Sequence, residues 1–229
     1  MRLTLEEIKQ ETSDVTSFIF KPEHPLDWQA GQFFHYILHH EPTDNRGSDR
    51  WFSVSSAPYE EVIRLTTRFA SQNGSSFKNA LKKLKTGDDI EASDLEGDFI
   101  LDNADRDYVF IAGGIGITPF RAILKQLDYE KKPIRVSLLY SNKGADNVPF
   151  KLELEELVKN HPEFQIHYFF SPDRLDEQKI RDLVPDFLEK MFYISGPEGM
   201  VESLGEDLTR MGLPQNQLKQ DWFPGYSED

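Results

Sequence analysis

The chain has 229 residues and a formal net charge of −14, from 40 acidic and 26 basic side chains. A negative field of this size repels phosphate backbones, so nucleic acid is excluded as an expected partner. Cysteine is absent, which excludes disulfides, thiolate metal sites and iron–sulfur clusters ligated by this chain. The length suits two domains that each bury a core, and redox chemistry would need a bound organic cofactor.

The first residues and the hydropathy bear on location. Residues 1–7 lack the apolar core of a signal peptide. No apolar run approaches the roughly 18 residues needed to cross a bilayer. We therefore expect a cytoplasmic protein without a membrane span.

The first half of the chain predicts short strands. Apolar residues alternate or cluster with aromatic and β-branched ones in residues 3–10, 15–20, 31–38 and 62–69. A turn and strand signal covers residues 87–92. Short strands separated by turns favour an antiparallel barrel or sandwich.

A short helix is predicted at residues 77–85, closed by Gly87. Its apolar stripe consists of Phe77, Leu81 and Leu84, and a separate basic stripe consists of Lys78, Lys82 and Lys85. The lysines form either a solvated face or a docking patch for an acidic protein partner.

Beyond residues 102–106, strands alternate with helices. The strand candidates are residues 108–112, 134–140, 165–170 and 191–195, with helical periodicity between and after them. Such alternation predicts a parallel sheet with right-handed crossovers. We therefore place an antiparallel β-barrel domain at residues 1–102 and an α/β, Rossmann-like domain at residues 103–229.

A glycine-rich turn follows the first strand of this second domain. It contains Gly113, Gly114, Gly116, Thr118 and Pro119, and a helical pattern leaves it. Glycines let the backbone approach a pyrophosphate closely, and the free N–H groups at a helix start face an anion. The turn departs from the Rossmann fingerprint, because Pro119 stands where a third glycine would be. It is a dinucleotide-site candidate, and the alternative is a plain strand-to-helix connection.

Two further segments reach the same sheet edge. In an open parallel sheet, ligands bind beyond the carboxyl ends of the strands. The residues predicted there, besides the glycine-rich turn, are Ser141, Lys143, Ser195, Gly196, Pro197 and Met200. Two glycine-containing turns at one edge favour a nucleotide cleft over either turn alone.

The order of these motifs resembles the ferredoxin–NADP reductase family of flavoproteins. Residues 50–56 are similar to the flavin motif R-x-Y-S-x-x-S, and residues 74–76 to the flavin phosphate turn. Residues 113–119 resemble the nicotinamide nucleotide turn, residues 195–197 the later C-G-P turn, and residues 221–226 an acidic-x-F-x-G-Y ending. The match spans nearly the whole chain.

The resemblance implies FAD as the cofactor and assigns residues 50–53 to it. Arg50 would bind the pyrophosphate through its fork of donors. Trp51 belongs to the same motif, and Phe52 would stack on the isoalloxazine ring in place of the usual tyrosine. Ser53 would hydrogen-bond flavin N5, because its hydroxyl both donates and accepts.

The resemblance assigns two further segments to the flavin. Thr66, Thr67 and Arg68 would contact its side chain and phosphates, although strand register decides which of them face it. Gly74, Ser75 and Ser76 would form a phosphate nest at a helix start. Helix capping by serine is the alternative for that turn.

The C-terminal residues complete the predicted catalytic set. Phe223 would cover the second face of the flavin, and Asp221 would lie near the nicotinamide carboxamide. Ser195 stands where many members of the family have cysteine, and it keeps the size and a donor without the polarizable sulfur. A last strand that only packs Trp222 and Phe223 into the core is the alternative.

The predicted function is hydride transfer from NADPH or NADH to FAD, followed by one-electron transfer to a ferredoxin, flavodoxin or similar soluble acceptor, or to a flavin. Lys143 favours NADPH, whereas the lack of an arginine beside Ser141 argues against it, so the donor stays open. The alternative is a non-catalytic flavin module that relays electrons or senses redox state. A module that never meets nicotinamide has no need of the turn at residues 113–119.

Overall fold

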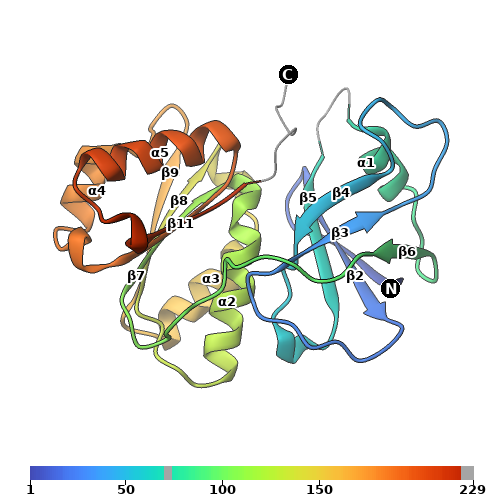
Figure 1. Ribbon diagram of the computed structural model, residues 1–229, viewed down its shortest axis with the longest axis horizontal. Helices are drawn as coiled ribbons and strands as arrows, with labels where there is room; N and C mark the ends of the chain where they lie inside the picture. Colours follow the sequence, from blue (N-terminus) through green and yellow to red (C-terminus); the bar gives the residue numbers. More distant parts are fainter. Residues whose placement is uncertain (70–73, 223–229) are drawn as a thin grey trace.

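The computed structural model describes residues 1–69 and 74–222, and it contains two sheets that form two halves of the molecule (Figure 1). One is a six-stranded antiparallel sheet with the order β4-β3-β6-β1-β2-β5. The other is a five-stranded parallel sheet with the order β11-β10-β7-β8-β9. The predicted fold class, a β-barrel-like domain followed by an α/β domain, is confirmed.

The antiparallel sheet comes from the segments in which apolar and polar residues alternate. Its strands are β1 (Arg2–Gln10), β2 (Val15–Pro22), β3 (Phe33–Ile37), β4 (Asp49–Ser53), β5 (Ile63–Arg68) and β6 (Asp89–Ala92). Alternation puts every second side chain on the inner face, where residues such as Leu3, Phe18 and Phe34 are buried in one core. A short 3₁₀ turn, η1 (Pro58–Glu60), precedes β5 and faces the other half of the molecule.

The helix predicted at residues 77–85 is shorter in the structure. It is α1 (Ser76–Leu81), with Phe77 and Leu81 buried as predicted. After Leu81 the backbone bonds tighten to the i→i+3 type, from Lys83 N to Ala80 O and from Leu84 N to Leu81 O. Such tightening is common in a last helical turn.

The parallel sheet is covered by helices on both faces. Its strands are β7 (Tyr108–Gly113), β8 (Val136–Asn142), β9 (Phe164–Phe170), β10 (Met191–Ser195) and β11 (Leu218–Asp221). Its helices are α2 (Ile117–Tyr129), α3 (Lys151–Asn160), α4 (Glu177–Leu183) and α5 (Glu198–Arg210). Helices α2 and α3 share one core with the sheet, and α4 and α5 share the other. Both faces are buried, which explains the nearly continuous apolar runs of β7 and β10.

The connection between the two sheets runs from β6 to β7. It includes Phe99, whose ring lies 5.5 Å from that of Phe120 and 4.9 Å from that of Tyr193. Lys219 Nζ on β11 donates to the carbonyl oxygens of Asp98 and Ile100. The boundary predicted between residues 102 and 103 falls in this connection and stays a prediction. Across the described part of the chain, no helix combines the length and apolar character required to span a bilayer.

Candidate functional site

The three described residues of the predicted catalytic set meet where the two sheets face each other. Parallel pairing puts Ser195 of β10 beside Asp221 of β11 and beside Ala112 of β7. Burial raises the pKa of Asp221 to about 6, while hydrogen bonds with Ser195 and Ser53 oppose this rise. Ser53 belongs to β4 in the antiparallel sheet, so one carboxyl group joins residues of both domains. Phe223, the fourth predicted residue, lies outside the described residues.

The two predicted nucleotide turns interlock through their glycines. A Cβ on Gly116 would lie 2.2 Å from the carbonyl oxygen of Ser195. A Cβ on Gly113 would lie 2.6 Å from the Met200 sulfur, and one on Gly196 would lie 2.7 Å from the Met200 methyl carbon. These glycines therefore have a packing reason that sequence reasoning missed: they let the β7–α2 turn touch the β10–α5 turn. Their approach to a pyrophosphate stays a prediction.

Two hydroxyl groups, one from strand β8 and one from helix α2, hold the same turn by hydrogen bonds. Gly114 has a φ of +52°, and its carbonyl accepts a hydrogen bond of 3.0 Å from the Tyr140 hydroxyl. The Thr118 hydroxyl donates to Ile115 O at 3.1 Å, and Pro119 is buried. The turn is thus held in shape without a ligand. Burial raises the pKa of Tyr140 well above its usual value, which keeps this hydroxyl a donor.

Arg50 is buried at the edge of the antiparallel sheet and keeps one nitrogen without a hydrogen bond. Its Nη1 donates to the carbonyl oxygens of Arg46 and Asp49, both at 2.5 Å. Its Nη2 is buried, makes no hydrogen bond to any residue that the structure describes, and lies 3.9 Å from Asp44 Oδ1. The guanidinium also lies 5.7 Å from the centre of the Phe77 ring. A buried cationic donor of this kind fits a phosphate oxygen.

A carboxylate already occupies the predicted phosphate position at the start of α1. Ser76 N donates to Asp44 Oδ2 at 2.8 Å, and the Ser76 hydroxyl accepts from Asp44 N at 3.0 Å. The bond from Ser76 N, assisted by Arg46, holds the pKa of Asp44 well below its usual range. Ser75 is the N-cap, with its hydroxyl accepting from Lys78 N. The backbone and side-chain donors here therefore fit an anionic group.

The structure gives the register of Thr66, Thr67 and Arg68. The Thr66 hydroxyl lies 2.7 Å from that of Ser55 and 2.8 Å from that of Ser17, so it is engaged within the sheet. Thr67, the next residue, is buried on the opposite face. Arg68 Nη1 donates to Asp14 at 2.8 Å, and its Nη2 would lie 3.7 Å from a Cβ on Gly114. Arg68 therefore reaches from the antiparallel sheet to the nucleotide turn.

The aromatic residues of the flavin motif are packed by their neighbours. The Trp51 ring stacks on His35 at 4.2 Å, and Phe52 lies 6.0 Å from Phe77 in a tilted arrangement. The Phe52 side chain is half-buried, so part of its surface stays accessible. Its assignment to the isoalloxazine ring stays a prediction.

The end of β8 contributes polar groups to the same edge of the parallel sheet. Ser141 is half-buried and Lys143 is exposed. Between them, Asn142 is buried, and its amide makes no hydrogen bond of good geometry to any described residue, although it interacts with the nearby Tyr140 hydroxyl. Sequence reasoning missed Asn142, although an amide at the end of a buried strand was the available signal. A buried amide with unused hydrogen-bonding capacity at this edge is compatible with a polar ligand.

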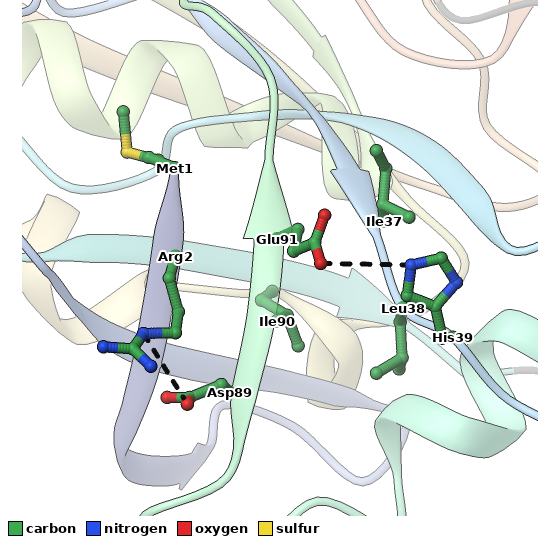
Figure 2. Close-up of a pocket in the computed structure, with 8 residues that line it drawn as sticks. All are labelled: Met1, Arg2, Ile37, Leu38, His39, Asp89, Ile90 and Glu91. Carbon is green, nitrogen blue, oxygen red and sulfur yellow. Dashed lines mark ion pairs between the residues drawn. The ribbon is translucent and has the colours of Figure 1, made fainter.

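Two hollows lie on the antiparallel half. One, of about 320 Å³, is lined by residues of β1, β3 and β6 and is crossed by ion pairs of Arg2 with Asp89 and of His39 with Glu91 (Figure 2). None of the predicted site residues lines it. The other, of about 430 Å³, is lined by residues 38–42 and by α1 residues that include Ser76. This second hollow adjoins the position that Asp44 occupies.

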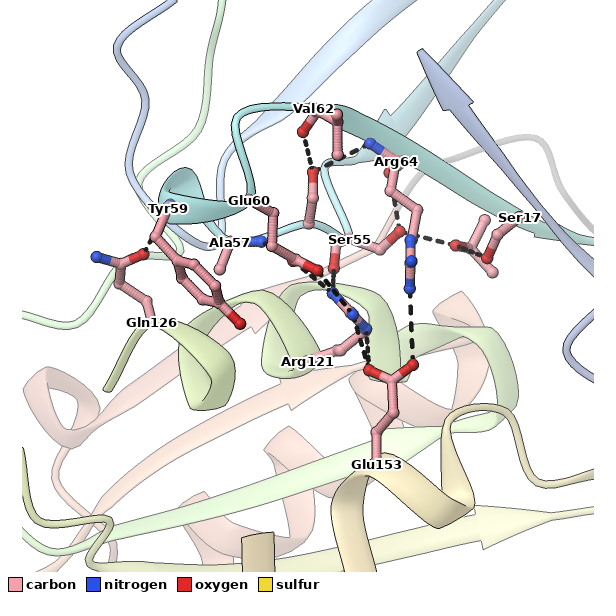
Figure 3. A network of polar contacts seen from close by, with 12 residues as sticks. Ser17, Ser55, Ala57, Tyr59, Glu60, Val62, Arg64, Arg121, Gln126 and Glu153 are labelled. Atoms are coloured by element: carbon pink, nitrogen blue, oxygen red, sulfur yellow. Dashed lines mark hydrogen bonds and ion pairs between the residues drawn. The ribbon is translucent and has the colours of Figure 1, made fainter. Parts of the chain in front are cut away.

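A buried cluster also links the two domains behind the site, and sequence reasoning missed it. Arg121 on α2 contacts Glu60 in η1, Glu153 on α3 and the carbonyl of Ser55 (Figure 3). The one signal for it in the sequence was an arginine directly after Phe120, among the apolar residues of α2.

Comparisons with known proteins agree with this geometry. The oxidoreductase NAD-binding domain family matches residues 110–205. A flavohemoprotein of Candida albicans is 32% identical, over 96% of this chain and 58% of its own length. The chain spans a little over half the length of the first curated relatives that it matches.

Two solved structures share the fold over both domains. The flavohem-like FAD/NAD-binding domain of nitric oxide dioxygenase from Vibrio cholerae superposes with a TM-score of 0.84 at 24% identity, covering 97% of this chain and 98% of that one. The ferredoxin–NADP⁺ reductase from Plasmodium falciparum superposes with a TM-score of 0.82 at 19% identity, covering 97% and 95%. Residues 110–205 therefore belong to the oxidoreductase NAD-binding domain family, and the whole chain is similar to FAD- and NAD(P)-binding reductases such as the flavohemoprotein modules and ferredoxin–NADP⁺ reductase.

Proposed function

We propose that this chain takes a hydride from NADPH or NADH, with FAD bound between its two domains, and delivers the electrons to a soluble carrier. The observation that supports this most is the meeting of Ser53, Ser195 and Asp221 across the domain boundary. When bound, FAD accepts the hydride with its two electrons and releases them one at a time. The protein contributes binding, orientation and the exclusion of water.

On the flavin side, Arg50 and Ser76 are the proposed anion-binding residues. Arg50 offers Nη2, which makes no hydrogen bond to the described residues, and Ser76 offers the backbone N–H that now donates to Asp44. The hollow of about 430 Å³ beside Ser76 offers room for the rest of a dinucleotide, which favours FAD over FMN. Ser53 presents a hydroxyl at the domain boundary, where it both donates and accepts.

On the nucleotide side, the interlocked turns hold the backbone in one shape before any ligand binds. Such preorganisation lowers the entropy lost on binding. Asp221 is proposed to accept the carboxamide N–H above about pH 6 and to be protonated below it. Ser195 steadies that carboxyl group by hydrogen bonding. Arg68 lies close enough to Gly114 to compensate the negative charge of a phosphate in a chain this acidic.

The proposed acceptor is a ferredoxin- or flavodoxin-type carrier. Lys82 and Lys85 are exposed on and after α1, and Lys82 Nζ lies 4.5 Å from the centre of the Phe69 ring. Lys78 differs from the predicted stripe, because it is half-buried and donates to Arg68 O at 2.9 Å. The docking patch is therefore narrower than the sequence indicated, and its role stays a proposal.

A haem group is the second candidate acceptor. The relatives that match 93 to 96% of this chain are flavohemoproteins, and the chain covers only 56 to 58% of their length. A haem-containing acceptor on another chain, or in another part of the protein, would fit that relation. Either acceptor takes electrons singly from the same reduced cofactor.

The test compares acceptors with the FAD-loaded protein reduced in the absence of oxygen. Ferredoxin, flavodoxin and a ferric haem protein are each mixed with it at low salt. Lys82→Glu combined with Lys85→Glu should slow the acidic carriers about tenfold and leave a small neutral dye unaffected. Equal slowing of the dye would contradict a docking role, and faster reduction of the haem protein than of either carrier would favour the second candidate.

A further inference from the structure

We propose that Arg121 is a positioning residue, which holds the nucleotide turn and the flavin motif at a fixed distance and angle. This inference rests on the proposed function and deepens it. It concerns a residue that touches neither proposed ligand and acts through the backbone of both binding segments.

Arg121 is the fifth residue of α2, three residues after Thr118 of the nucleotide turn. Its side chain is only 2% exposed although it carries a full charge. Its Nη1 donates to the carbonyl oxygen of Ser55 at 2.7 Å and to Glu60 at 2.8 Å. Its Nε donates to Glu153 at 2.9 Å, and its Nη2 lies 2.7 Å from the same carboxylate. One planar group thus holds three segments (Figure 3).

The contact with Ser55 ties Arg121 to the flavin motif. Ser55 is two residues after Ser53, and Val54 between them is fully buried. Ser55 N and its hydroxyl both donate to Arg64 O, at 2.9 and 2.8 Å. Ser55 is therefore held by Arg64 on one side and by Arg121 on the other. A shift of Ser55 would move Ser53, which is two residues away. Arg121 is the charged donor that joins this segment to the helix of the nucleotide turn.

The charges around Arg121 are balanced by residues of both domains. Glu153 Oε1 also lies 3.7 Å from Arg64 and 3.4 Å from Lys9. Burial acts to raise the pKa of Glu60 and of Glu153, but the two arginines hold both values below the ordinary one. Both carboxylates are therefore charged at neutral pH. Compared with apolar side chains of similar size, a buried cluster of charges of this kind adds little stability. Its main contribution is to fix the geometry of the segments that it joins.

The geometry of the fork explains why a positioning role is expected. A guanidinium that contacts three points off one line fixes an angle as well as a distance. Hydride transfer is sensitive to misplacement of about 1 Å between the reacting groups. Two further contacts between the domains lie nearby: a hydrogen bond of 3.3 Å from Tyr59 N to Gln126 Oε1, and a stack of Tyr59 on Tyr129 at 4.2 Å, in which Tyr129 is 61% exposed. Two stacked rings can shift parallel to each other at little cost. The stack therefore holds the two domains together without fixing their relative position.

Two variants separate positioning from stability. Arg121→Lys keeps the charge and loses the fork. Arg121→Met combined with Glu60→Met removes one charge of each sign and leaves Glu153 with Arg64 and Lys9, so it should fold. Tyr129→Ala is the interface control, and Arg210→Met is the control for loss of an exposed arginine ion pair, that with Glu177.

The first readout is the single-turnover rate of flavin reduction at saturating nucleotide, measured with the nucleotide dissociation constant. The Met pair should lower the rate at least about tenfold, which corresponds to about 1.4 kcal/mol, with the dissociation constant changed less than about twofold. Arg121→Lys should give an intermediate rate. Both control variants should stay within about twofold of the unmodified protein.

The second readout does not depend on activity. The chain has no cysteine, so Lys85→Cys and Glu202→Cys introduce two unique labelling sites, both exposed and one in each domain. Spin labels there report the distance between the domains. The Met pair should broaden or shift this distribution, whereas both control variants should leave it narrow.

The outcomes distinguish positioning by Arg121, a role for Arg121 that does not involve positioning, and a failure of the proposed function. A slowed rate with a changed distance distribution, absent from Tyr129→Ala, supports positioning by Arg121. An unchanged rate and distance in the Met pair, or an equal loss in Tyr129→Ala, would overturn it. If neither nucleotide reduced the unmodified protein, the proposed function would fail, and the label distances alone would still decide whether Arg121 sets the domain geometry.

Discussion

The nucleotide turn and the flavin phosphate turn are two helix starts of opposite construction. At residues 113–119, Gly113 and Gly116 bring the backbone into contact with Met200 and Ser195, and α2 then runs for 13 residues. At residues 74–76, the helix is only six residues long, and the carboxylate of Asp44 occupies the anion position. The first turn is shaped by contacts that leave no space. The second is shaped by a side chain whose place we propose an anionic ligand to take.

This difference predicts how each turn responds to substitution. A close-packed turn tolerates no added atom, so substitutions there should act on folding and binding together. A turn held by exchangeable hydrogen bonds should tolerate substitution, with effects confined to the affinity for its anion. The following expectations test this contrast, from the largest effect to the smallest.

Gly116→Ala should be the most damaging change at the nucleotide turn. Its Cβ would lie 2.2 Å from a backbone oxygen of Ser195, which cannot rotate away. We expect a loss of roughly 3 kcal/mol in the free energy of unfolding, measured by denaturant titration, and a loss of nucleotide binding. Gly199→Ala is the matched control, because Gly199 sits in α5 and no described residue outside its own stretch of helix lies within 4 Å of the added Cβ. It should be stabilising by about 0.5–1 kcal/mol, and equal behaviour of the two variants would contradict the packing account.

Arg50→Met should act mainly on the flavin side. A hydrogen bond to a charged group is worth roughly 1.5–3 kcal/mol, so we expect FAD to bind about 10- to 100-fold more weakly. Quenching of flavin fluorescence on binding measures the affinity. Arg210→Met, an exposed arginine on α5, is the control and should leave the affinity unchanged. Unaltered FAD binding by Arg50→Met would remove the main cation from the proposed site.

Asp221 lies where the two halves meet, and its titration should be visible in stability. Burial raises its pKa in the folded state to about 6, above the ordinary value of about 4. Its contribution is therefore full below pH 4 and is lost as the pH rises through 6. Above pH 6, Asp221→Asn should be more stable than the unmodified protein by on the order of 1–2 kcal/mol, with the difference vanishing near pH 4. A pH-independent difference between the two would contradict a titration at this residue.

Asp44→Asn should give the smallest effect, in the opposite direction to Arg50→Met. The amide keeps an oxygen for Ser76 N but loses the charge that competes with an incoming phosphate. We expect FAD to bind a few-fold more tightly, by less than about 1 kcal/mol. Asp182→Asn, at an exposed acidic residue of α4, serves as the control and should leave FAD affinity unchanged. Weaker binding in Asp44→Asn would show that Asp44 supports the site and does not compete for it.

The fold followed from the sequence because its signals are local. The alternation in β1 and β5, and the i, i+3, i+4, i+7 spacing of Phe120, Ile123, Leu124 and Leu127 in α2, reflect side chains that face one core. The end of α1 was misplaced by several residues, because Leu84 packs on the core from a turn outside the helix.

The site followed only in part, because its contacts join residues far apart in the chain. The side-by-side placement of Ser195 and Asp221 depends on the register of β10 with β11, which no local sequence pattern reveals. Arg121 finds Glu60 and Ser55 across 61 and 66 residues. The packing role of Gly116 needs the position of Ser195 in space. Long-range pairings such as these are fixed by tertiary structure and leave no periodic trace.

The central claim is that both turns serve one site in which a reduced nicotinamide nucleotide meets a flavin. An anaerobic titration of the FAD-loaded protein with NADPH, and separately with NADH, tests it most directly through the flavin absorbance. The account predicts rapid, stoichiometric bleaching by at least one of the two nucleotides. Bound flavin that neither nucleotide bleaches would contradict hydride transfer and favour a relay module, and failure to bind any flavin would contradict the assignment of Arg50 and Ser76.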